Sequence, residues 1–406
     1  MVVIKALKIF FLGMGLTTTI VVAQDKLDFS KVPGTVVAHK PKSAKIYLGS
    51  PSICKLPNGD YLVSHDNFGP LSTEHESAVS NIYRSTNKGK AWQPIAEING
   101  AFWSKLFVHQ NAVYLIGTNK HHGNLIVRKS TDNGYTWTEP SDANNGLLLV
   151  GEYHVAPTPP IYNKGRIWRA IEDASGANRK IWGPRYSAMM ISAPQDSDLL
   201  KAESWTASNF IPMDSTYLNG NFGGWVEGNA IVAPNGKMVD VLRVQDKISF
   251  DEKAAIVHVS ADGKKATFDP TKDFIRFPGG SKKFVIRYDE KSKKYWTLTN
   301  YIPQDIKSEA MKLPKVKYAT HVRNTLALCS STDLQNWQVN HIVLQNLDVL
   351  KHAFQYADWM VEGNDIVFVS RTAFDDGLGG AANNHNNNFI TFHKIKKFRK
   401  FTNVIK

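Results

Sequence analysis

Short apolar runs separated by turn residues recur along the whole chain, and no long amphipathic helix pattern interrupts them. The commonest arrangement is an apolar run, a turn containing Asn or Gly, and a second apolar run. Tight hairpin turns need residues that accept positive φ, so Asn-Gly and similar pairs between apolar runs predict β-hairpins. Six such hairpins are predicted, at residues 51–66, 105–118, 159–173, 228–244, 283–300 and 358–372.

A second hairpin with a different turn follows several of these. Residues 130–137, STDNGYTW, match the Asp-box pattern S-x-D-x-G-x-x-W in full, and residues 85–92, STNKGKAW, match it with Asn in place of Asp. Residues 260–263 and 331–337 are degenerate copies. In this turn a short acid or amide side chain bonds backbone amides, Gly adopts positive φ, and Trp packs back on the hairpin. Four related copies indicate a repeated structural unit.

The repeated unit is therefore a pair of hairpins, which makes a four-stranded sheet of about 60 residues. Repetition of such sheets around an axis predicts an all-β fold, a β-propeller of four-stranded blades. Six units are visible in the sequence, and residues 35–48 either close the ring with the last blade or belong to a seventh. No linker rich in Pro, Gly or Ser divides residues 24–406, so we expect a single propeller domain.

The first 23 residues have the pattern of a cleavable secretory signal peptide. Lys5 and Lys8 form a positive segment, residues 9–22 are apolar apart from three threonines, and small residues precede Gln24. This pattern predicts cleavage after Ala23 and a secreted or periplasmic protein. No later segment is apolar enough to predict a membrane span.

Composition narrows the class of partner. The chain carries a net charge of +13, or +11 without Lys5 and Lys8, and 11% of its residues are aromatic. A basic, aromatic-rich protein suits either nucleic acid or an anionic polysaccharide, and the predicted export favours the polysaccharide. Cys54 and Cys329 both lie in strand-like apolar runs, and the sequence leaves open whether they are buried free thiols or a disulfide.

The propeller topology predicts which residues share one face of the ring. The start of each first strand and the end of each second strand lie on the same face, because the two strands are antiparallel. The Asp-box turns join third and fourth strands on the opposite rim, so we expect them to be structural. The polar residues placed on the inner face are His65, Asp66, Tyr153, His154, Arg169, Glu172, Glu227, Asn229, Arg243, Lys282, Lys283, Asn300, His352, Gln355, Tyr356, Asp358 and Arg371, with His75, His122, Arg185, Tyr186, Arg323 and His385 in adjoining loops.

Arginine, lysine and histidine outnumber carboxylates on this face. A funnel lined in this way favours an anionic ligand, since guanidinium groups pair with carboxylate or sulfate. We therefore predict an acidic carbohydrate as the substrate. The predicted substrate-binding residues are Arg185, Glu227, Asn229, Arg243, Lys282, His352, Gln355, Asp358 and Arg371.

Two kinds of reaction fit an arginine-lined funnel. A sialidase requires an arginine triad, a tyrosine nucleophile with a glutamate partner, and an acid. A lyase acting on a uronate requires a base, an acid for the leaving oxygen, and a cation that neutralises the carboxylate. The predicted catalytic cluster for a lyase is Tyr153, His154, Arg169, Arg185 and Tyr186, which supplies every one of these roles within one blade.

Residues 151–157, GEYHVAP, together with residues 165–170, GRIWRA, resemble the corresponding blade of the propeller ulvan lyases. The wider chain resembles the related bacterial propellers that act on rhamnose–glucuronate linkages, known as α-L-rhamnosidases or rhamnose–glucuronate lyases. This resemblance implies a seven-bladed ring, with Tyr153 as the catalytic tyrosine and Arg169 neutralising the uronate. The supporting stretches are 49–53, 223–229 and 352–356.

The same resemblance implies a catalytic histidine from an earlier blade. His122 is the first candidate, and His75 and His154 are the alternatives. The rhamnosidase branch would use a histidine near the N-terminus on the opposite face, and His39 is the position that matches.

The sequence thus favours a polysaccharide lyase that cleaves rhamnose–uronic acid linkages by β-elimination. The alternatives are an α-L-rhamnosidase or another glycoside hydrolase, sialidase-like, on the same acidic glycans, and a carbohydrate-binding propeller without turnover. The expected chemistry requires no cofactor or metal, and a structural calcium or zinc ion is left open.

Overall fold

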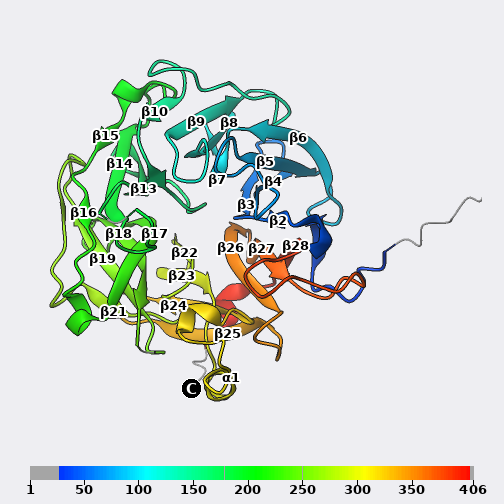
Figure 1. Cartoon of the computed structure of the whole chain (residues 1–406). Helices are drawn as coiled ribbons and strands as arrows, with labels where there is room; N and C mark the ends of the chain where they lie inside the picture. Colours follow the sequence, from blue (N-terminus) through cyan, green and yellow to red (C-terminus); the bar gives the residue numbers. More distant parts are fainter. Residues whose placement is uncertain (1–26, 178, 249, 403–406) are drawn as a thin grey trace, which may run out of the picture.

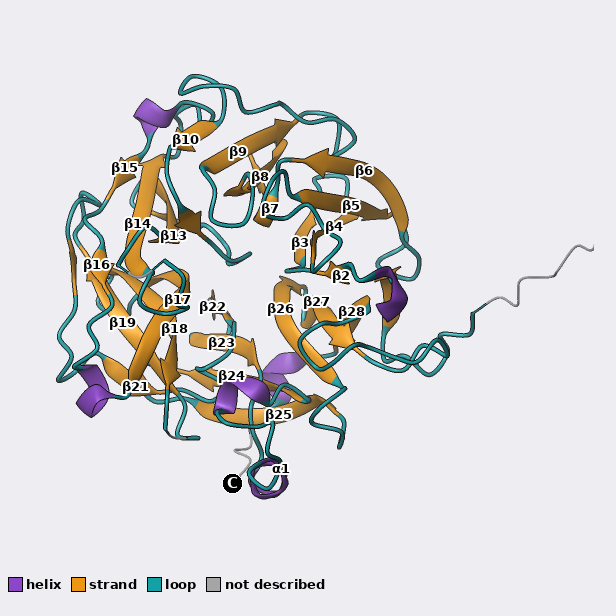
Figure 2. Ribbon diagram, viewed as in Figure 1, coloured by secondary structure: helices purple, strands orange, loops and turns teal. Residues whose placement is uncertain are grey.

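The computed structural model describes residues 27–177, 179–248 and 250–402, so the predicted signal peptide lies outside the described residues. Within these ranges, six antiparallel sheets stand around a common centre (Figure 1). No helix in them is long and apolar enough to cross a membrane. The helices are short (Figure 2): α1 (Gln304–Ala310) and the 3-10 turns η1 (Lys42–Ala44), η2 (Ala202–Ser204), η3 (Tyr217–Gly220) and η4 (Ala319–His321) lie in connections between strands, and the 3-10 turn η5 (Phe398–Lys400) follows the last strand.

The first strand of each blade lies nearest the centre of the ring, and the later strands lie further out (Figure 1). Blade 1 contains β2 (Tyr47–Leu48), β3 (Ser52–Lys55), β4 (Tyr61–Phe68), β5 (Val79–Ser85) and β6 (Gln93–Asn99). Blade 2 contains β7 (Phe102–His109), β8 (Ala112–Thr118), β9 (Leu125–Ser130) and β10 (Leu147–Leu149). Blade 3 contains β11 (Tyr153–His154), β12 (Ile161–Asn163), β13 (Arg166–Asp173), β14 (Ser187–Pro194), β15 (Thr206–Ala207) and β16 (Ile211–Pro212).

The second half of the ring repeats this arrangement. Blade 4 contains β17 (Phe222–Val232), β18 (Met238–Asp246), β19 (Lys253–Val259), β20 (Ala266–Thr267) and β21 (Phe274–Arg276). Blade 5 contains β22 (Val285–Asp289), β23 (Lys294–Thr299), β24 (Thr325–Ser331) and β25 (Gln338–Gln345). Blade 6 contains β26 (Ala353–Glu362), β27 (Asp365–Ala373), β28 (Phe389–Ile395) and, as its outermost strand, β1 (Thr35–His39).

The all-β propeller is confirmed, and the expected seventh blade is wrong. The chain forms six blades because β1 pairs antiparallel with β28, with Thr35 opposite Phe392 and His39 opposite Phe389. The N-terminal segment therefore supplies the outer strand of the last blade, and Tyr47–Leu48 joins blade 1. This pairing satisfies the outer edge of β28, so the ring closes without another sheet.

The hydrophobic core lies between neighbouring blades. Phe107 of blade 2 packs in one cluster with Ile167 and Met189 of blade 3, and Trp296 of blade 5 packs with Phe368 of blade 6. Each sheet is therefore covered on both faces, which explains why the inner strands read as nearly continuous apolar runs. Cys54 in β3 and Cys329 in β24 are both buried free thiols, which settles the alternative that the sequence left open.

The full Asp-box forms the turn between β9 and β10. One carboxylate oxygen of Asp132 accepts hydrogen bonds from the backbone amides of Tyr135 at 3.1 Å and Thr136 at 3.0 Å. Gly134 has φ of 95°, and the Trp137 indole donates to its carbonyl oxygen at 3.0 Å. Trp137 packs against the core between blades 1 and 2, so the turn braces adjacent blades.

Replacement of Asp132 by alanine should lower the free energy of unfolding by about 1 kcal/mol, because two turn amides lose their acceptor. Asp132→Asn should cost much less. The matching turn of blade 1 already uses Asn87, whose side-chain oxygen accepts from the Ala91 amide at 2.9 Å. Urea denaturation of both variants checks the difference. Equal losses in Asp132→Ala and Asp132→Asn would contradict this account of the turn.

Candidate functional site

Three inner strands carry the same local irregularity. The pairing of β7, β17 and β26 with their neighbours shifts register within each strand. Within these shifts, Trp103, Glu227 and Tyr356 have φ of 50°, 61° and 54°, which is uncommon for residues other than glycine. Bulges of this kind redirect a side chain and are typical of functional sites. All three side chains line one cavity at the centre of the ring.

This cavity has a volume of ≈ 280 Å³ and lies on the face predicted for the site. Blades 1, 2, 3, 4 and 6 contribute to its wall. Positive, acidic and aromatic side chains alternate around it, which is the composition expected for a polar ligand held against apolar surfaces. Its charged and aromatic lining residues are Asp66, Phe68, Glu74, Phe102, Trp103, His121, His154, Trp182, Tyr186, Glu227, Arg243, Tyr356, Arg371 and His385.

Tyr356 and Glu227 both line this cavity. Arg243 donates to the Glu227 carboxylate at 2.9 Å. Burial opposes ionisation of Glu227. The charge and hydrogen bond of Arg243, together with the nearby His154 and Tyr356 side chains, outweigh burial, so the pKa of Glu227 lies below its ordinary value. Glu227 is therefore ionised next to a tyrosine hydroxyl.

Two further buried guanidinium groups surround Tyr356. Arg371 lies 4.8 Å from the centre of the Tyr356 ring and Arg323 lies 5.9 Å from it. Arg323 donates to Gln355 at 2.7 Å, and Arg371 donates to Asn387 at 2.9 Å. Within the described residues, neither guanidinium group forms an ion pair with a carboxylate.

The charges around Tyr356 are consequently unbalanced. Of the three arginines Arg243, Arg323 and Arg371, only Arg243 forms an ion pair with a carboxylate within the described residues, that of Glu227. Burial is the largest influence on Arg371 and lowers its pKa to about 10, so its cationic form is desolvated but still present at neutral pH. Buried cations without a counter-charge are costly, and an anionic ligand offsets that cost.

Asp66, at the end of β4, is the candidate acid of the cavity. Its carboxyl oxygens accept from the Trp103 amide at 3.1 Å and from the Ser80 hydroxyl at 3.2 Å. Burial nevertheless dominates and raises the pKa of Asp66 to about 7. A carboxyl group that keeps its proton near neutral pH suits a general acid. Glu74, whose pKa is also raised by burial, is the second acidic group in the wall.

The shifted pKa of Asp66 predicts a defined pH dependence of stability. The folded chain keeps this proton up to about pH 7, whereas the unfolded chain releases it near pH 3.8. Between these values, rising pH therefore lowers the free energy of unfolding through Asp66. Asp66→Asn lacks this titration, so wild type should lose about 4 kcal/mol relative to the variant between the two pH values. Urea denaturation of both proteins across this range measures the difference, and a constant difference would refute the shift.

Histidines and aromatic rings form the opposite part of the wall. His154 lies with its ring centre 4.2 Å from that of Trp103, and its Nδ1 is 2.7 Å from a carboxylate oxygen of Glu172. His122 Nε2 is 3.0 Å from the Tyr186 hydroxyl. Burial is the largest influence on His122 and lowers its pKa to about 2, so this imidazole is neutral.

The structure brings together part of the predicted site. His154, Tyr186, Glu227, Arg243 and Arg371 line the central cavity. His122 and Arg185 lie in an adjoining pocket of ≈ 570 Å³, where Arg185 donates to the Glu152 carboxylate at 3.0 Å. Gln355 stands behind the wall and orients Arg323.

Other predicted residues lie away from the cavity wall. Arg169 is 1% exposed and donates to the Ala156 carbonyl and the Thr158 hydroxyl, and Tyr153 packs at the edge of the core between blades 2 and 3. Lys282 is ion-paired with Glu252. Arg169, Tyr153 and Lys282 were predicted to bind substrate or to act in catalysis, but none of them lines the cavity.

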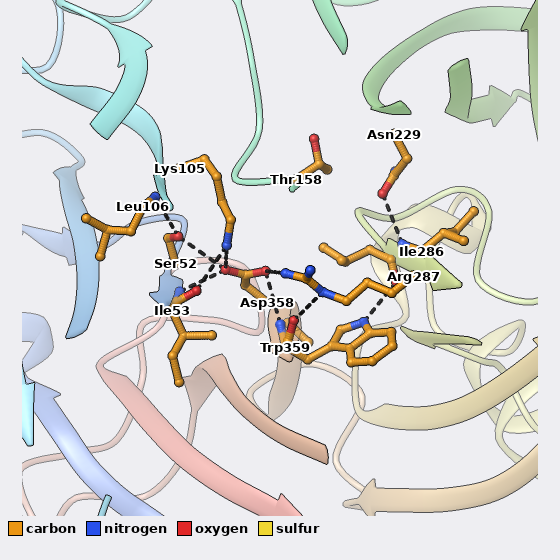
Figure 3. Close-up of polar contacts among 12 residues, drawn as sticks. Ser52, Ile53, Lys105, Leu106, Thr158, Asn229, Ile286, Arg287, Asp358 and Trp359 are labelled. Carbon is orange, nitrogen blue, oxygen red and sulfur yellow. Dashed lines mark hydrogen bonds and ion pairs between the residues drawn. The ribbon is translucent and has the colours of Figure 1, made fainter. Parts of the chain in front are cut away.

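The remaining four also make contacts elsewhere. Asn229 accepts from the Ile286 amide at 3.0 Å and links blade 4 to blade 5. His352 lies 3.3 Å from Asp375, and His39 lies 3.0 Å from Asp376 at the outer strand of blade 6. Asp358 belongs to a buried ion network at the centre of the ring (Figure 3), where its carboxylate accepts from the Ile53 amide at 2.8 Å and pairs with Lys105.

Sequence reasoning placed Tyr356, Arg323, Asp66 and His385 on the correct face without selecting them for the site. It missed Trp103 and His121. A positional signal existed for Trp103, which stands near the start of the first strand of its blade, β7. The bulge that turns each of Trp103, Glu227 and Tyr356 into the cavity has no comparable signature in a single sequence.

No protein-family model and no curated protein sequence matches the chain. Solved structures match it throughout the described fold. A Dyadobacter fermentans protein of unknown function aligns with a TM-score of 0.58 and 13% identity, covering 90% of this chain and 98% of that one. The Penicillium chrysogenum α-L-arabinanase complexed with arabinobiose aligns with a TM-score of 0.52 and 17% identity, covering 92% and 99%.

A Trypanosoma rangeli sialidase with a covalently bound difluorosialic acid aligns with a TM-score of 0.51 and 11% identity, covering 87% of this chain and 55% of that one. At such identities the likeness concerns the fold alone. The neighbours support a propeller fold shared with glycoside hydrolases. The resemblance to ulvan lyases and rhamnosidases stays a prediction.

Proposed function

We propose that the chain is a glycoside hydrolase that acts on a glycan carrying a carboxylate group, with Tyr356 as nucleophile. The observation that carries this proposal is that Tyr356 and the Arg243-paired carboxylate of Glu227 line one cavity, with the buried Arg323 and Arg371 beside the Tyr356 ring. The glycoside hydrolases among the structural neighbours support the same class of reaction. A tyrosine nucleophile is an established alternative to a carboxylate nucleophile in sialidases.

In the first step, the Tyr356 oxygen attacks the anomeric carbon while its proton passes to the ionised Glu227. Arg243 and Arg323 both interact electrostatically with the Tyr356 side chain, so they stabilise negative charge as it develops on the phenolic oxygen. Asp66 donates its proton to the leaving glycosidic oxygen, and the bond from that oxygen to the anomeric carbon breaks. The result is a covalent glycosyl-tyrosine and a released alcohol.

In the second step, Asp66 is ionised and accepts a proton from a water molecule. The water oxygen attacks the anomeric carbon, and the Tyr356 oxygen leaves and recovers its proton from Glu227. A pKa of about 7 allows Asp66 to serve as acid and then as base near neutral pH. Two displacements at one carbon retain the anomeric configuration.

The arginine surplus is the reason for proposing an acidic sugar. A carboxylate of sialic or uronic acid placed against Arg371 supplies the missing counter-charge in bidentate geometry. The ring centres of Phe68 and Tyr356 lie 4.4 Å and 4.8 Å from the Arg371 guanidinium, and both rings limit the directions in which this group can move. The predicted export places such an enzyme among extracellular polysaccharides.

Arg371→Met should reduce kcat/KM on an acidic substrate by about 30-fold or more, because the carboxylate of the bound substrate loses the buried guanidinium that pairs with it. The same variant should lose much less on an analogue whose carboxylate is replaced by a neutral amide. Steady-state kinetics on both compounds measures the split. Arg276→Met is the matched control, because the Arg276 side chain is 85% exposed and lies outside the cavity wall.

A digestion panel tests the class of reaction. Sialylated glycans, ulvan and rhamnose–glucuronate oligosaccharides are incubated with the protein in ¹⁸O-labelled water. Hydrolysis incorporates one labelled oxygen at the new reducing end and creates no ultraviolet absorption. This outcome, together with retention of configuration by NMR, supports the proposal.

A lyase is the second candidate, and the hydrogen bond between His122 and Tyr186 beside the cavity favours it. A tyrosine hydroxyl next to a neutral imidazole is a plausible proton carrier for β-elimination. A lyase produces an unsaturated uronate that absorbs in the ultraviolet and contains no oxygen from water. That product would overturn the hydrolase proposal, and absence of any product across the panel would do the same.

A further inference from the structure

A cluster of metal-binding side chains lies at the edge of the cavity and takes no part in the proposed hydrolysis. Glu74 and His75 lie in the connection from β4 to β5, and His121 lies in the connection from β8 to β9. One potential ligand atom from each residue lies within 4.8 Å of the other two. The His121 amide donates to the Glu74 carbonyl at 2.7 Å, so the backbones of the two loops are already joined.

The side chains of Glu74, His75 and His121 are close enough to approach a single metal ion. The ring centres of His75 and His121 are 4.6 Å apart, and His75 Nε2 is 3.5 Å from the Glu74 carboxylate. His121 Nδ1 is buried and, within the described residues, has no hydrogen-bond partner. A buried polar atom without a partner costs free energy, and a bound metal ion is one way to satisfy it. His75 is 70% exposed and can therefore reorient without disturbing the core.

We infer that Glu74, His75 and His121 bind one divalent metal ion of the zinc type, with an open coordination position toward the cavity. Two imidazoles and one carboxylate form the donor set of catalytic zinc sites, in which the fourth position is held by water or substrate. Calcium and magnesium prefer sites built from several oxygen ligands, and this cluster has only one carboxylate.

The three residues lie between two spaces that a glycan could occupy. Glu74 and His121 line the central cavity, and His75 and His121 line the adjoining pocket. A metal ion held by all three residues stands where these two spaces meet, and an oxygen of a bound glycan can reach its open position from either side. This inference is independent of the proposed hydrolysis, because metal binding is measured without a substrate.

The test uses the purified, untagged full-length chain. The protein is treated with a chelator, incubated with zinc chloride and desalted, and its metal content is measured by mass spectrometry. We expect one zinc ion per chain in the wild type and none in His75→Ala or His121→Ala. Cobalt(II) should give the visible absorption of a low-coordinate site in the wild type and lose it in both variants.

His258→Ala is the matched control. His258 also lies beside a carboxylate, with Nε2 3.0 Å from Asp273, but outside the cluster, so this variant should keep its zinc. His75→Ala keeps the test decisive if His121→Ala disturbs the fold, because His75 is mostly exposed. The inference is overturned if the desalted wild type holds no zinc, or if His75→Ala holds as much as the wild type.

Discussion

Tyr356→Phe is expected to lower kcat on any glycan that the protein hydrolyses by at least about 10⁴-fold, as loss of a nucleophile does in other covalent mechanisms. The variant loses one oxygen atom and keeps the ring that lies beside Arg371 and Arg323. Substrate binding should therefore change little. Single-turnover kinetics, with binding measured separately by calorimetry, checks both parts of this prediction.

Two controls separate this role from a general effect on the fold. Tyr288→Phe removes the hydroxyl of a tyrosine that is 42% exposed on the inner strand of blade 5, away from the cavity wall, and should be fully active. Tyr186→Phe removes the hydroxyl that a lyase would need. Normal turnover by Tyr356→Phe combined with inactivity of Tyr186→Phe would transfer the chemistry to the Tyr186 side of the cavity.

Asp358→Asn is expected to lower the free energy of unfolding by about 3–5 kcal/mol, the usual cost of removing one partner of a buried ion pair. Asp358 is fully buried, and its carboxylate pairs with Lys105 and lies 3.9 Å from Arg287 (Figure 3). Lys283 also acts on it electrostatically. Removal of this carboxylate leaves the buried Lys105 and Lys283 and the partly exposed Arg287 without the carboxylate that they share.

Urea denaturation of Asp358→Asn measures that cost. Glu290→Gln is the matched control, because it removes a carboxylate whose pair with Lys293 is exposed on both sides, and it should change stability by less than about 1 kcal/mol. Addition of Lys105→Met to Asp358→Asn should recover part of the loss, since one uncompensated cation is then absent. A loss in Asp358→Asn no larger than that in Glu290→Gln would show that the network does not stabilise the ring.

The Asp358 network also shows how a position on the correct face can serve the fold instead of the ligand. Tyr356 and Asp358 are two residues apart on β26; Tyr356 lies within a register shift, and Asp358 is the residue at which regular pairing resumes. Tyr356 enters the cavity, whereas Asp358 ties blade 6 to blades 1, 2 and 5. The sequence predicts that both approach the axis of the ring. The depth at which each one lies depends on the bulge, which is a property of the paired strands.

The arginines illustrate the same limit. Arg169, Arg243 and Arg371 all stand on second strands and were all predicted for the site, yet only Arg243 and Arg371 reach the cavity. Arg169 lies in the middle of β13, where it meets the Ala156 carbonyl and Thr158 from its own blade. A resemblance between short motifs cannot measure this depth, because it depends on which groups the folded chain brings against each side chain.

The sequence by itself determined the repeating hairpins, the Asp-box turns, the single ring and the face that holds the site. These features follow from local chemistry, since turn residues with positive φ, alternating apolar runs and antiparallel connections leave few arrangements open. Only the tertiary structure decided the closure of six blades by β1, the cavity that Tyr356 and Glu227 share, the unbalanced arginines and the approach of Glu74 and His75 to His121. Each of these joins residues that are distant in sequence, and their meeting depends on strand register and blade packing that no local pattern encodes.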